Sequence, residues 1–214
     1  MNYRNLRDEI DKNVFILPVS KTKPYSAILD VFEEGARAFG ENRVQEIERK
    51  FPLPENRPEG MKVYLIGQLQ KNKVRKAVFL SDRIESVDSK DLLLLIDREC
   101  GRIGKKIEVL LEFNSSKEEN KSGFEKREDL LDALKLSLTL KNLDVIGIMT
   151  VGPLTDDEGK IRSAFKETHD LFKDACKLKS LSILSMGMSA DYKIAIEEKS
   201  TEVRLGSIIF GERK

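Results

Sequence analysis

The sequence has no tryptophan, one histidine and two cysteines, and these shortages exclude several kinds of site. The lone histidine, His169, excludes a metal site built from several imidazole ligands. Cys100 and Cys176 lie in separate expected helices without a partner at metal-ligand spacing, so neither a zinc site nor a disulfide framework is indicated. We expect both thiols to be buried or inert.

Neither sign of charge prevails, and no long hydrophobic run is present. Lysine and arginine number 38 against 37 aspartates and glutamates, for a formal net charge of +1. This balance gives no reason to expect nucleic acid or an anionic membrane as a partner. The first 13 residues lack the apolar core of a signal peptide, and no run approaches the roughly 20 apolar residues that cross a membrane. We therefore expect a cytoplasmic protein.

What the sequence does have is a regular alternation of short apolar strands and amphipathic helices. Apolar runs bounded by polar residues predict strands at residues 14–19, 38–41, 62–67, 83–87, 106–113, 143–151, 181–188 and 201–205. Helices are expected at residues 44–51, 71–80, 90–102, 126–140 and 190–197, with others starting at Pro24 and at residues 156–157. A further short helix at residues 3–12 precedes the first strand.

This alternation predicts an α/β fold with a parallel sheet. Eight strand–helix units within the 214 residues favour a closed (β/α)8 barrel of the TIM type, as a single domain over residues 1–214 with an extra N-terminal helix. An open doubly wound sheet is the alternative, although no glycine-rich dinucleotide fingerprint follows the first strand. In a barrel, the carboxyl ends of the strands surround one mouth, where the chemistry of such folds is placed.

The first expected strand, residues 14–19, ends abruptly at Ser20 and Lys21. Its run is almost entirely apolar, which is typical of a strand buried on both faces of a parallel sheet. Lys21 would then stand at the mouth of the barrel. Our hypothesis is that it forms a Schiff base with pyridoxal 5′-phosphate (PLP), although this stretch by itself favours the simpler alternative. The alternative is a strand-end lysine that only reaches solvent.

The last two strand ends carry the features of a phosphate site. Ser189 follows the seventh strand and is expected to cap the next helix, where backbone N–H groups are free. Gly206 follows the eighth strand, lets the backbone approach a ligand, and is followed by the hydroxyl of Ser207. Barrels frequently bind phosphate with these two loops. The alternative is that Ser189 only caps a helix and Gly206 only forms a turn.

Arg204 alternates with Val203 and Leu205, so its side chain is expected to point into the barrel or its mouth. A guanidinium there keeps its charge and needs an acceptor. The acceptor is either a carboxylate or the pyridine nitrogen of PLP. An arginine at that nitrogen would keep it unprotonated, which suits racemisation or simple cofactor binding better than transamination.

Seven motifs that occur in order connect these residues to a known family. They are VSKTKP at 19–24, FGENRVQE at 39–46, IGQLQKNK at 66–73, NSSKEENKSGF at 114–124, GIMTVGP at 147–153, SMGMSADYKIAI at 185–196 and STEVRLGSIIFGER at 200–213. Together they make the chain resemble the YggS/PROSC family of PLP-binding homeostasis proteins over almost its whole length. That family is similar to the N-terminal barrel domain of bacterial alanine racemase and lacks the C-terminal β domain of that enzyme.

The resemblance implies a set of cofactor-binding residues. These are Lys21 for the Schiff base, Ser189, Gly206 and Ser207 for the phosphate, Arg204 for the pyridine nitrogen, and Asn42 near the cofactor. Lys23 and Lys121 match further lysines of the family, as secondary acceptors during PLP transfer or as solvated loop lysines. Lys121 belongs to a polar loop, residues 114–123, that is long for a strand–helix connection and is a candidate functional loop. The chain departs from the family in a short segment before the first strand and at Lys199, where a glycine is usual.

Three functions fit these residues. The resemblance implies a non-catalytic carrier that takes part in intracellular PLP homeostasis, with PLP-dependent apo-enzymes as possible recipients. A small PLP-dependent amino-acid racemase of low activity is the alternative, and a phosphate-binding barrel enzyme without PLP is the third. We expect the carrier, because a racemase needs a second acid or base that its C-terminal domain supports, and this chain ends shortly after Phe210 and Gly211. Without that domain we also expect a monomer.

Overall fold

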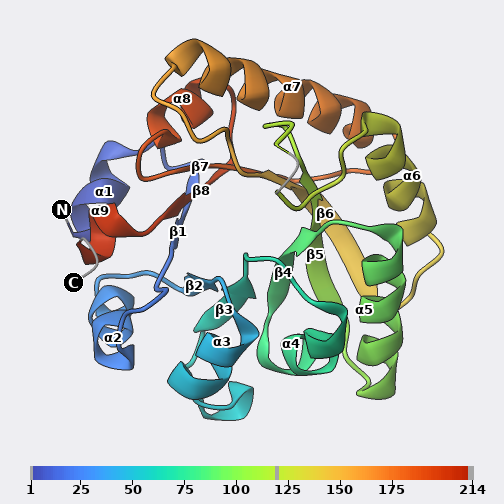
Figure 1. Cartoon of the computed structure of the whole chain (residues 1–214). Coiled ribbons are helices and arrows are strands. Elements are labelled where there is room, and N and C mark those ends of the chain that lie inside the picture. The colour runs from blue at the N-terminus through green and yellow to red at the C-terminus, as the bar shows by residue number, and fades with distance from the viewer. Residues whose placement is uncertain (1, 119–120, 212–214) are drawn as a thin grey trace.

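The computed structural model describes residues 2–118 and 121–211, which form a ring of parallel strands surrounded by helices (Figure 1). The strands are β1 (Phe15–Pro18), β2 (Ala38–Glu41), β3 (Lys62–Leu65), β4 (Arg83–Val87), β5 (Ile107–Phe113), β6 (Leu143–Thr150), β7 (Ile183–Met188) and β8 (Glu202–Leu205). All eight predicted strands are confirmed, and no predicted end differs from the observed one by more than two residues.

The strands form one sheet that nearly closes on itself. Neighbours pair in the order β1-β8-β7-β6-β5-β4-β3-β2, and every pair is parallel. The two end strands, β1 and β2, meet through a bridge between Val19 and Gly40. The Ser20 amide also donates a hydrogen bond of 3.0 Å to the Gly40 carbonyl. The predicted (β/α)8 barrel is therefore confirmed, and the open-sheet alternative is wrong.

Helices fill the connections and cover the outside of the sheet (Figure 1). They are α1 (Tyr3–Glu9), α2 (Tyr25–Glu33), α3 (Val44–Lys50), α4 (Val74–Leu80), α5 (Lys90–Arg102), α6 (Arg127–Ser137), α7 (Glu158–Cys176), α8 (Tyr192–Glu197) and α9 (Ser207–Phe210), with short 3-10 helices η1 (Pro54–Asn56) and η2 (Lys71–Lys73). The predicted N-terminal helix, α1, is present, and it lies on the same side of the barrel as α9 (Figure 1).

Two helices, α4 and α8, begin three and two residues later than predicted. Residues 71–73 form a 3-10 turn before α4, and α8 begins at Tyr192 and not at Ala190. The expected start of α7 is confirmed, because the Asp157 side chain accepts hydrogen bonds from the Gly159 and Lys160 amides. Side-chain acceptors at this position satisfy N–H groups that have no partner within the helix.

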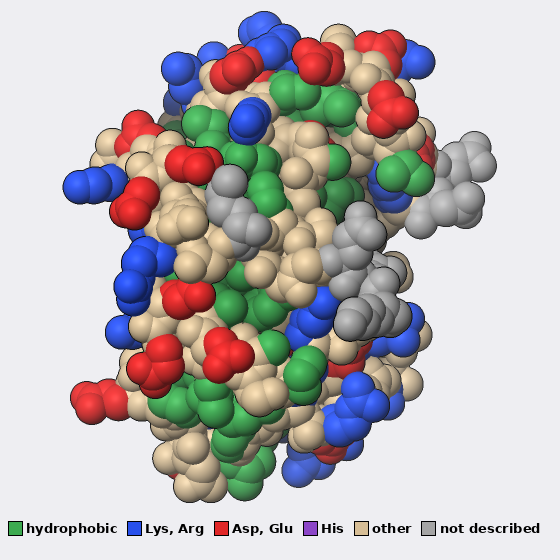
Figure 2. All heavy atoms as spheres, turned by 90° about the vertical axis from the view of Figure 1, so that its left-hand side faces the viewer, with side chains coloured by type: hydrophobic (Ala, Val, Ile, Leu, Met, Phe, Trp, Pro, Cys, Tyr) green, Lys and Arg blue, Asp and Glu red, His purple; other side chains and the backbone are tan. Residues whose placement is uncertain are grey.

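The burial of the strands follows from their position inside the ring of helices. β1 is buried on both faces as predicted, except for Phe15, which is 37% exposed at the end of the strand away from Lys21. The face seen in Figure 2 carries acidic and basic side chains interspersed, with hydrophobic side chains between them. No helix in the described part of the chain is long and apolar enough to cross a membrane.

Candidate functional site

The turn that carries Lys21 is fixed by hydrogen bonds on both sides of the lysine. Before it, the buried Ser20 donates its hydroxyl to Glu41 over 2.6 Å, and the Lys50 ammonium donates to the Ser20 carbonyl over 2.8 Å. After it, the Thr22 amide donates to the Glu46 carboxylate over 2.8 Å. Thr22 has a φ of 67°, a left-handed conformation that few non-glycine residues adopt. Lys21 is itself partly buried and lies at the carboxyl end of β1, where the sequence places it.

The loops after β7 and β8 touch each other. The Gly206 amide donates a hydrogen bond of 3.2 Å to the Ser189 hydroxyl, which brings two of the predicted phosphate residues together. Ser207 follows directly and is exposed at the start of α9. A Cβ added to Gly206 would only reach ordinary contact with Val19, at 3.4 Å from its carbonyl oxygen. Packing within the protein therefore leaves room there for a side chain or for part of a ligand.

The prediction that Ser189 caps the following helix is wrong. The residue before α8 is Asp191, and its carboxylate accepts a hydrogen bond of 2.6 Å from the Met188 amide. A tight turn over these residues delays the helix, so the Ser189 hydroxyl is directed to the β8 loop instead. The serine is still at the predicted place after β7, and α8 is a short helix of six residues with Asp191 at its N-cap.

Arg204 is buried and held in a fixed position. Its Nη1 donates to the Ser185 hydroxyl over 2.8 Å and its Nη2 to the Thr150 carbonyl over 2.7 Å. Among the described residues no carboxylate lies within ion-pair distance of this guanidinium. The described residues therefore give Arg204 no ion pair. A guanidinium has five N–H groups, so donors remain for a ligand.

Below Arg204, charged side chains from non-neighbouring strands meet inside the barrel. Glu202 on β8 pairs with Arg83 on β4 over 3.1 Å. The Ser185 hydroxyl lies 2.8 Å from Glu202 and 3.2 Å from Glu85. Because it has a single proton, it donates a hydrogen bond to only one of these carboxyl groups at a time. Complete burial and then the charge of Glu202 raise the pKa of Glu85 well above its usual range. The raised pKa favours the neutral form of Glu85, which lessens the negative charge near Arg204.

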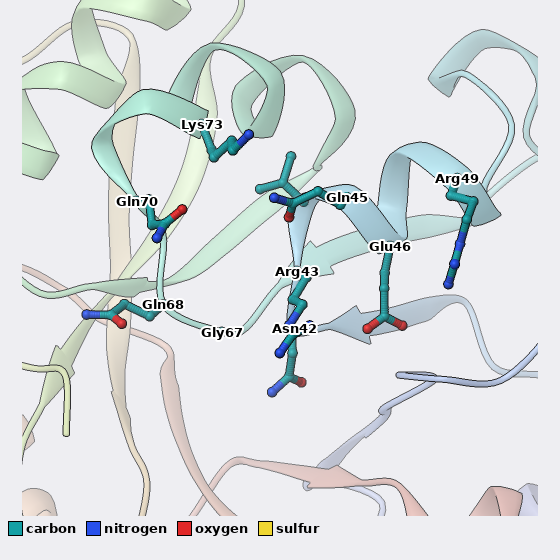
Figure 3. A pocket seen from close by; sticks show the side chains of 10 residues that line it. Asn42, Arg43, Gln45, Glu46, Arg49, Gly67, Gln68, Gln70 and Lys73 are labelled. Carbon is teal, nitrogen blue, oxygen red and sulfur yellow. The ribbon is translucent and has the colours of Figure 1, made fainter. Parts of the chain in front are cut away.

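Asn42 lines a pocket of about 800 Å³ between the β2–α3 and β3–η2 connections (Figure 3). Its Oδ1 is buried without a hydrogen-bond partner among the described residues, which is costly for a polar atom unless a ligand or water satisfies it. Gly67 packs against it so closely that an added Cβ would lie 2.3 Å from the Asn42 carbonyl oxygen. The close approach fixes the backbone of Asn42 at the mouth.

Thr150 and Ser185 lie at strand ends that the sequence predicts to surround the mouth, and in the structure both hold Arg204. Glu112, at the end of β5 with a buried carboxyl, was not predicted from the sequence. In the sequence, Glu112 stands out as a charged residue inside the apolar run KIEVLLEF. It lies two residues after Leu110 and therefore on the same, inward face of the strand. Lys121, which the sequence analysis did name, donates to Glu118 over 2.8 Å and to the Gly152 carbonyl over 2.9 Å.

The residues present fit PLP. Arg204 offers free N–H donors to a ring nitrogen, and Ser189 with Gly206 offers a hydroxyl and an amide to a phosphate. Lys21 supplies a primary amine on the neighbouring strand, since β1 pairs with β8. No group of three or more histidine, cysteine or carboxylate side chains able to hold a metal ion occurs in the described part of the chain.

The cysteines lie away from this mouth. Burial raises the pKa of Cys100 to about 11, so its thiol stays protonated at neutral pH and is a poor nucleophile. Cys176 is partly buried in the last turn of α7. The prediction of a buried thiol is confirmed for Cys100.

Comparisons with known proteins agree with this geometry. Residues 1–214 match the family model described as alanine racemase, N-terminal domain. The chain is 38% identical over 200 residues to the pyridoxal phosphate homeostasis protein of Helicobacter pylori strain J99, which covers 93% of this chain and 88% of that protein. It superimposes on the structure of PipY from Synechococcus elongatus PCC7942 with PLP bound, with a TM-score of 0.88 and 33% identity over 97% of both chains.

The fold extends to more distant proteins. Alanine racemase of Clostridium difficile 630 superimposes with a TM-score of 0.79 at 17% identity, covering 98% of this chain and 55% of that enzyme, and at this identity the likeness concerns the barrel alone. The family model matches residues 1–214, and the identity to the Helicobacter pylori protein extends over 93% of the chain. The chain belongs to the family of pyridoxal phosphate homeostasis proteins, built on the alanine racemase N-terminal domain.

Proposed function

We propose that this protein binds PLP as a Schiff base on Lys21 and takes part in PLP homeostasis as a non-catalytic carrier. The observation that carries the proposal is the contact between Ser189 and Gly206 beside a fixed, buried Arg204, one strand away from the Lys21 turn. Two relatives support it, because one is named a pyridoxal phosphate homeostasis protein and PipY was solved with PLP bound.

PLP supplies an aldehyde that condenses with a primary amine. The chain's own residues would bind and orient it. Ser189 and the Gly206 amide would exchange their mutual hydrogen bond for bonds to the phosphate, with Ser207 as a further donor. Arg204 would donate to the pyridine nitrogen and, as a permanent cation, disfavour its protonation. Asn42 would gain a partner for its buried oxygen.

An absorbance titration tests PLP binding directly. Purified protein mixed with PLP should develop the yellow band of a Schiff base, and borohydride should abolish it. The Lys21→Ala variant should not form the band, whereas Lys23→Ala, in the same turn, should keep it. A Lys21→Ala protein that retains the full band would refute the assignment of the lysine.

A second assay separates the carrier from a racemase of low activity. Incubation of the loaded protein with L-alanine should give no turnover to D-alanine above the rate of free PLP. Robust stereoinversion that depends on Lys21 would contradict the carrier. A cytoplasmic location, a monomeric state, delivery to PLP-dependent apo-enzymes and a part for Lys23 or Lys121 in that delivery stay predictions.

A further inference from the structure

Glu112 is a buried carboxyl group that the proposed PLP site does not use. Its side chain is only 4% exposed, at the carboxyl end of β5. Oε1 accepts a hydrogen bond of 2.8 Å from the Ser122 hydroxyl. Oε2 is buried without a partner among the described residues. An unsatisfied carboxylate oxygen in the protein interior is expensive, and it calls for a ligand that donates to it.

The protonation of Glu112 agrees with a functional role. Burial raises its pKa to about 7, and the charge of Asp88 adds to this effect, while Ser122 and Arg204 oppose it. The group therefore exchanges protons near neutral pH, at a cost to folding that a glutamine in its place would avoid. Carboxyl groups with such a cost and such a pKa gather at sites that handle ligands or protons.

Glu112 lines a small pocket beside the barrel mouth that also contains a cation. The pocket has a volume of about 200 Å³, and it is lined by Gln68, Glu112, Phe113, Asn114, Lys121, Ser122 and Val151. One water molecule occupies roughly 30 Å³, so this space holds a molecule of several non-hydrogen atoms. The Lys121 ammonium makes two hydrogen bonds, to Glu118 and to Gly152, and a third N–H remains for a ligand.

Lys121 and Ser122, in the connection between β5 and α6, form one wall of this pocket. The Phe124 amide donates to the Glu112 carbonyl over 2.7 Å, and the Asn114 amide donates to the Phe124 carbonyl over 3.0 Å. These bonds fold the loop back beside β5 and bring Ser122 and Lys121 over the strand end. Gly123, at a φ of +114°, permits the turn, since an added Cβ would lie 2.7 Å from the Asn114 nitrogen.

The two charges select the ligand. Glu112 disfavours a lone anion, and the Lys121 ammonium, although it pairs with Glu118 over 2.8 Å, keeps a donor for a carboxylate, so a molecule with both an ammonium and a carboxylate group matches the two side chains. We propose that this pocket binds a zwitterionic α-amino acid, with Glu112 receiving its ammonium group and Lys121 its carboxylate. The consequence of this binding rests on the proposed function, because the amine of the bound amino acid would lie at the barrel mouth, where PLP is proposed to bind.

The chemical step is an exchange of amines. Glu112 takes one proton from the ammonium group and leaves a neutral amine. With PLP bound on Lys21 as proposed, that amine would replace the Lys21 nitrogen at the aldehyde carbon: one carbon–nitrogen double bond would form, the one to Lys21 would break, and Lys21 would leave as an amine. No oxidant or reductant takes part. The protein would thus release PLP in response to amino acids.

Ligand-detected saturation-transfer NMR on the PLP-free protein tests the pocket without any PLP chemistry. L-alanine should bind, and ethylamine and propionate, which each lack one of its charges, should bind at least tenfold more weakly. Glu112→Gln and Lys121→Met should each weaken L-alanine binding about tenfold. Glu108→Gln, the same substitution at the other end of β5, should leave it unchanged.

Two results would overturn the proposal: equal affinity of the wild type and both site variants for L-alanine, or ethylamine binding as tightly as L-alanine. The absorbance titration with PLP is read separately. A wild type that fails to form the Schiff-base band refutes the proposed function, while the NMR experiment still decides on the amino-acid pocket.

Discussion

At the scale of single residues, the barrel interior is built around one arginine whose partners are neutral. Arg204 is held by a serine hydroxyl and a backbone carbonyl, and burial raises the pKa of the nearby Glu85 well above its usual range. An arginine paired with a carboxylate would have part of its charge compensated before any ligand arrives. This one keeps its charge for the ligand, which is the condition for binding a pyridine nitrogen.

Replacing this cation should weaken PLP binding more than it weakens the fold. We expect Arg204→Met to raise the dissociation constant of PLP by roughly ten- to a hundredfold, since hydrogen bonds to charged groups contribute about 1.5–3 kcal/mol. Fluorescence titration measures it. Arg162→Met, which removes a surface arginine paired with Glu197 and Glu198, is the control and should leave PLP binding unchanged.

Glu112 should make stability depend on pH in a predictable direction. Its folded-state pKa of about 7 exceeds the usual value of 4.5, so the folded protein binds an extra proton between those pH values. Stability therefore falls as the pH rises through this window, by about 3 kcal/mol for the whole shift. Glu112→Gln should stabilise the protein by about 1–3 kcal/mol at pH 8 and have little effect near pH 4.

Urea denaturation at the two pH values tests this prediction. Glu108→Gln, at a half-exposed position of the same strand, should show no such difference. An equal effect of Glu112→Gln at both pH values would show that the carboxyl does not titrate where its burial predicts.

At the scale of elements, the loops after β7 and β8 give a test that separates folding from binding. Gly206 has a φ of −108°, outside the left-handed region that favours glycine, and an added Cβ would make only ordinary contacts. Gly206→Ala should therefore keep the wild-type melting temperature and bind PLP at least several-fold more weakly, because the methyl group occupies space next to the proposed phosphate.

The control for this prediction lies on the neighbouring strand. Gly187 has a φ of +97°, and an added Cβ would lie 2.6 Å from that of Ala195. Gly187→Ala should therefore lower the stability by about 1–3 kcal/mol, as strained backbone positions do. Calorimetry and a PLP titration on both variants measure the two effects. A Gly206→Ala protein with unchanged PLP affinity would argue against the phosphate position.

Several features of the strands and helices could be predicted from the sequence. Eight apolar runs bounded by turns predicted every strand, and the alternation in residues 201–205 predicted that Arg204 points inward. The start of α8 was missed, because a serine before a helical pattern is a common cap and only the tertiary contact with Gly206 draws it away. The partners of Arg204 lie on β6 and β7, and no local pattern predicts contacts at such separations.

At the scale of the whole molecule, the barrel closes next to its proposed cofactor site. β1 and β2 meet through the bridge from Val19 to Gly40, directly before Lys21, while β8 on the other side of β1 carries Arg204 and Gly206. A ligand that joins Lys21 to the β7 and β8 loops would therefore strengthen the junction of the first and last strands.

PLP should accordingly raise the stability of the entire domain. At a free concentration of a hundred times the dissociation constant, binding contributes about 2.7 kcal/mol, which corresponds to roughly 5–10 °C in melting temperature for a chain of this size. Differential scanning calorimetry with increasing PLP should show this rise, and inorganic phosphate at the same concentrations should give a much smaller one. A melting temperature that does not change with PLP would contradict the site.

The most direct test of the central claim is peptide mapping of the borohydride-reduced complex with PLP. Reduction fixes the cofactor to the lysine that holds it, and mass spectrometry of the digested protein then identifies that lysine. The account predicts a pyridoxyl group on Lys21 at close to one per chain. A stoichiometric adduct on Lys23, Lys121 or any other lysine, with Lys21 unmodified, would contradict it.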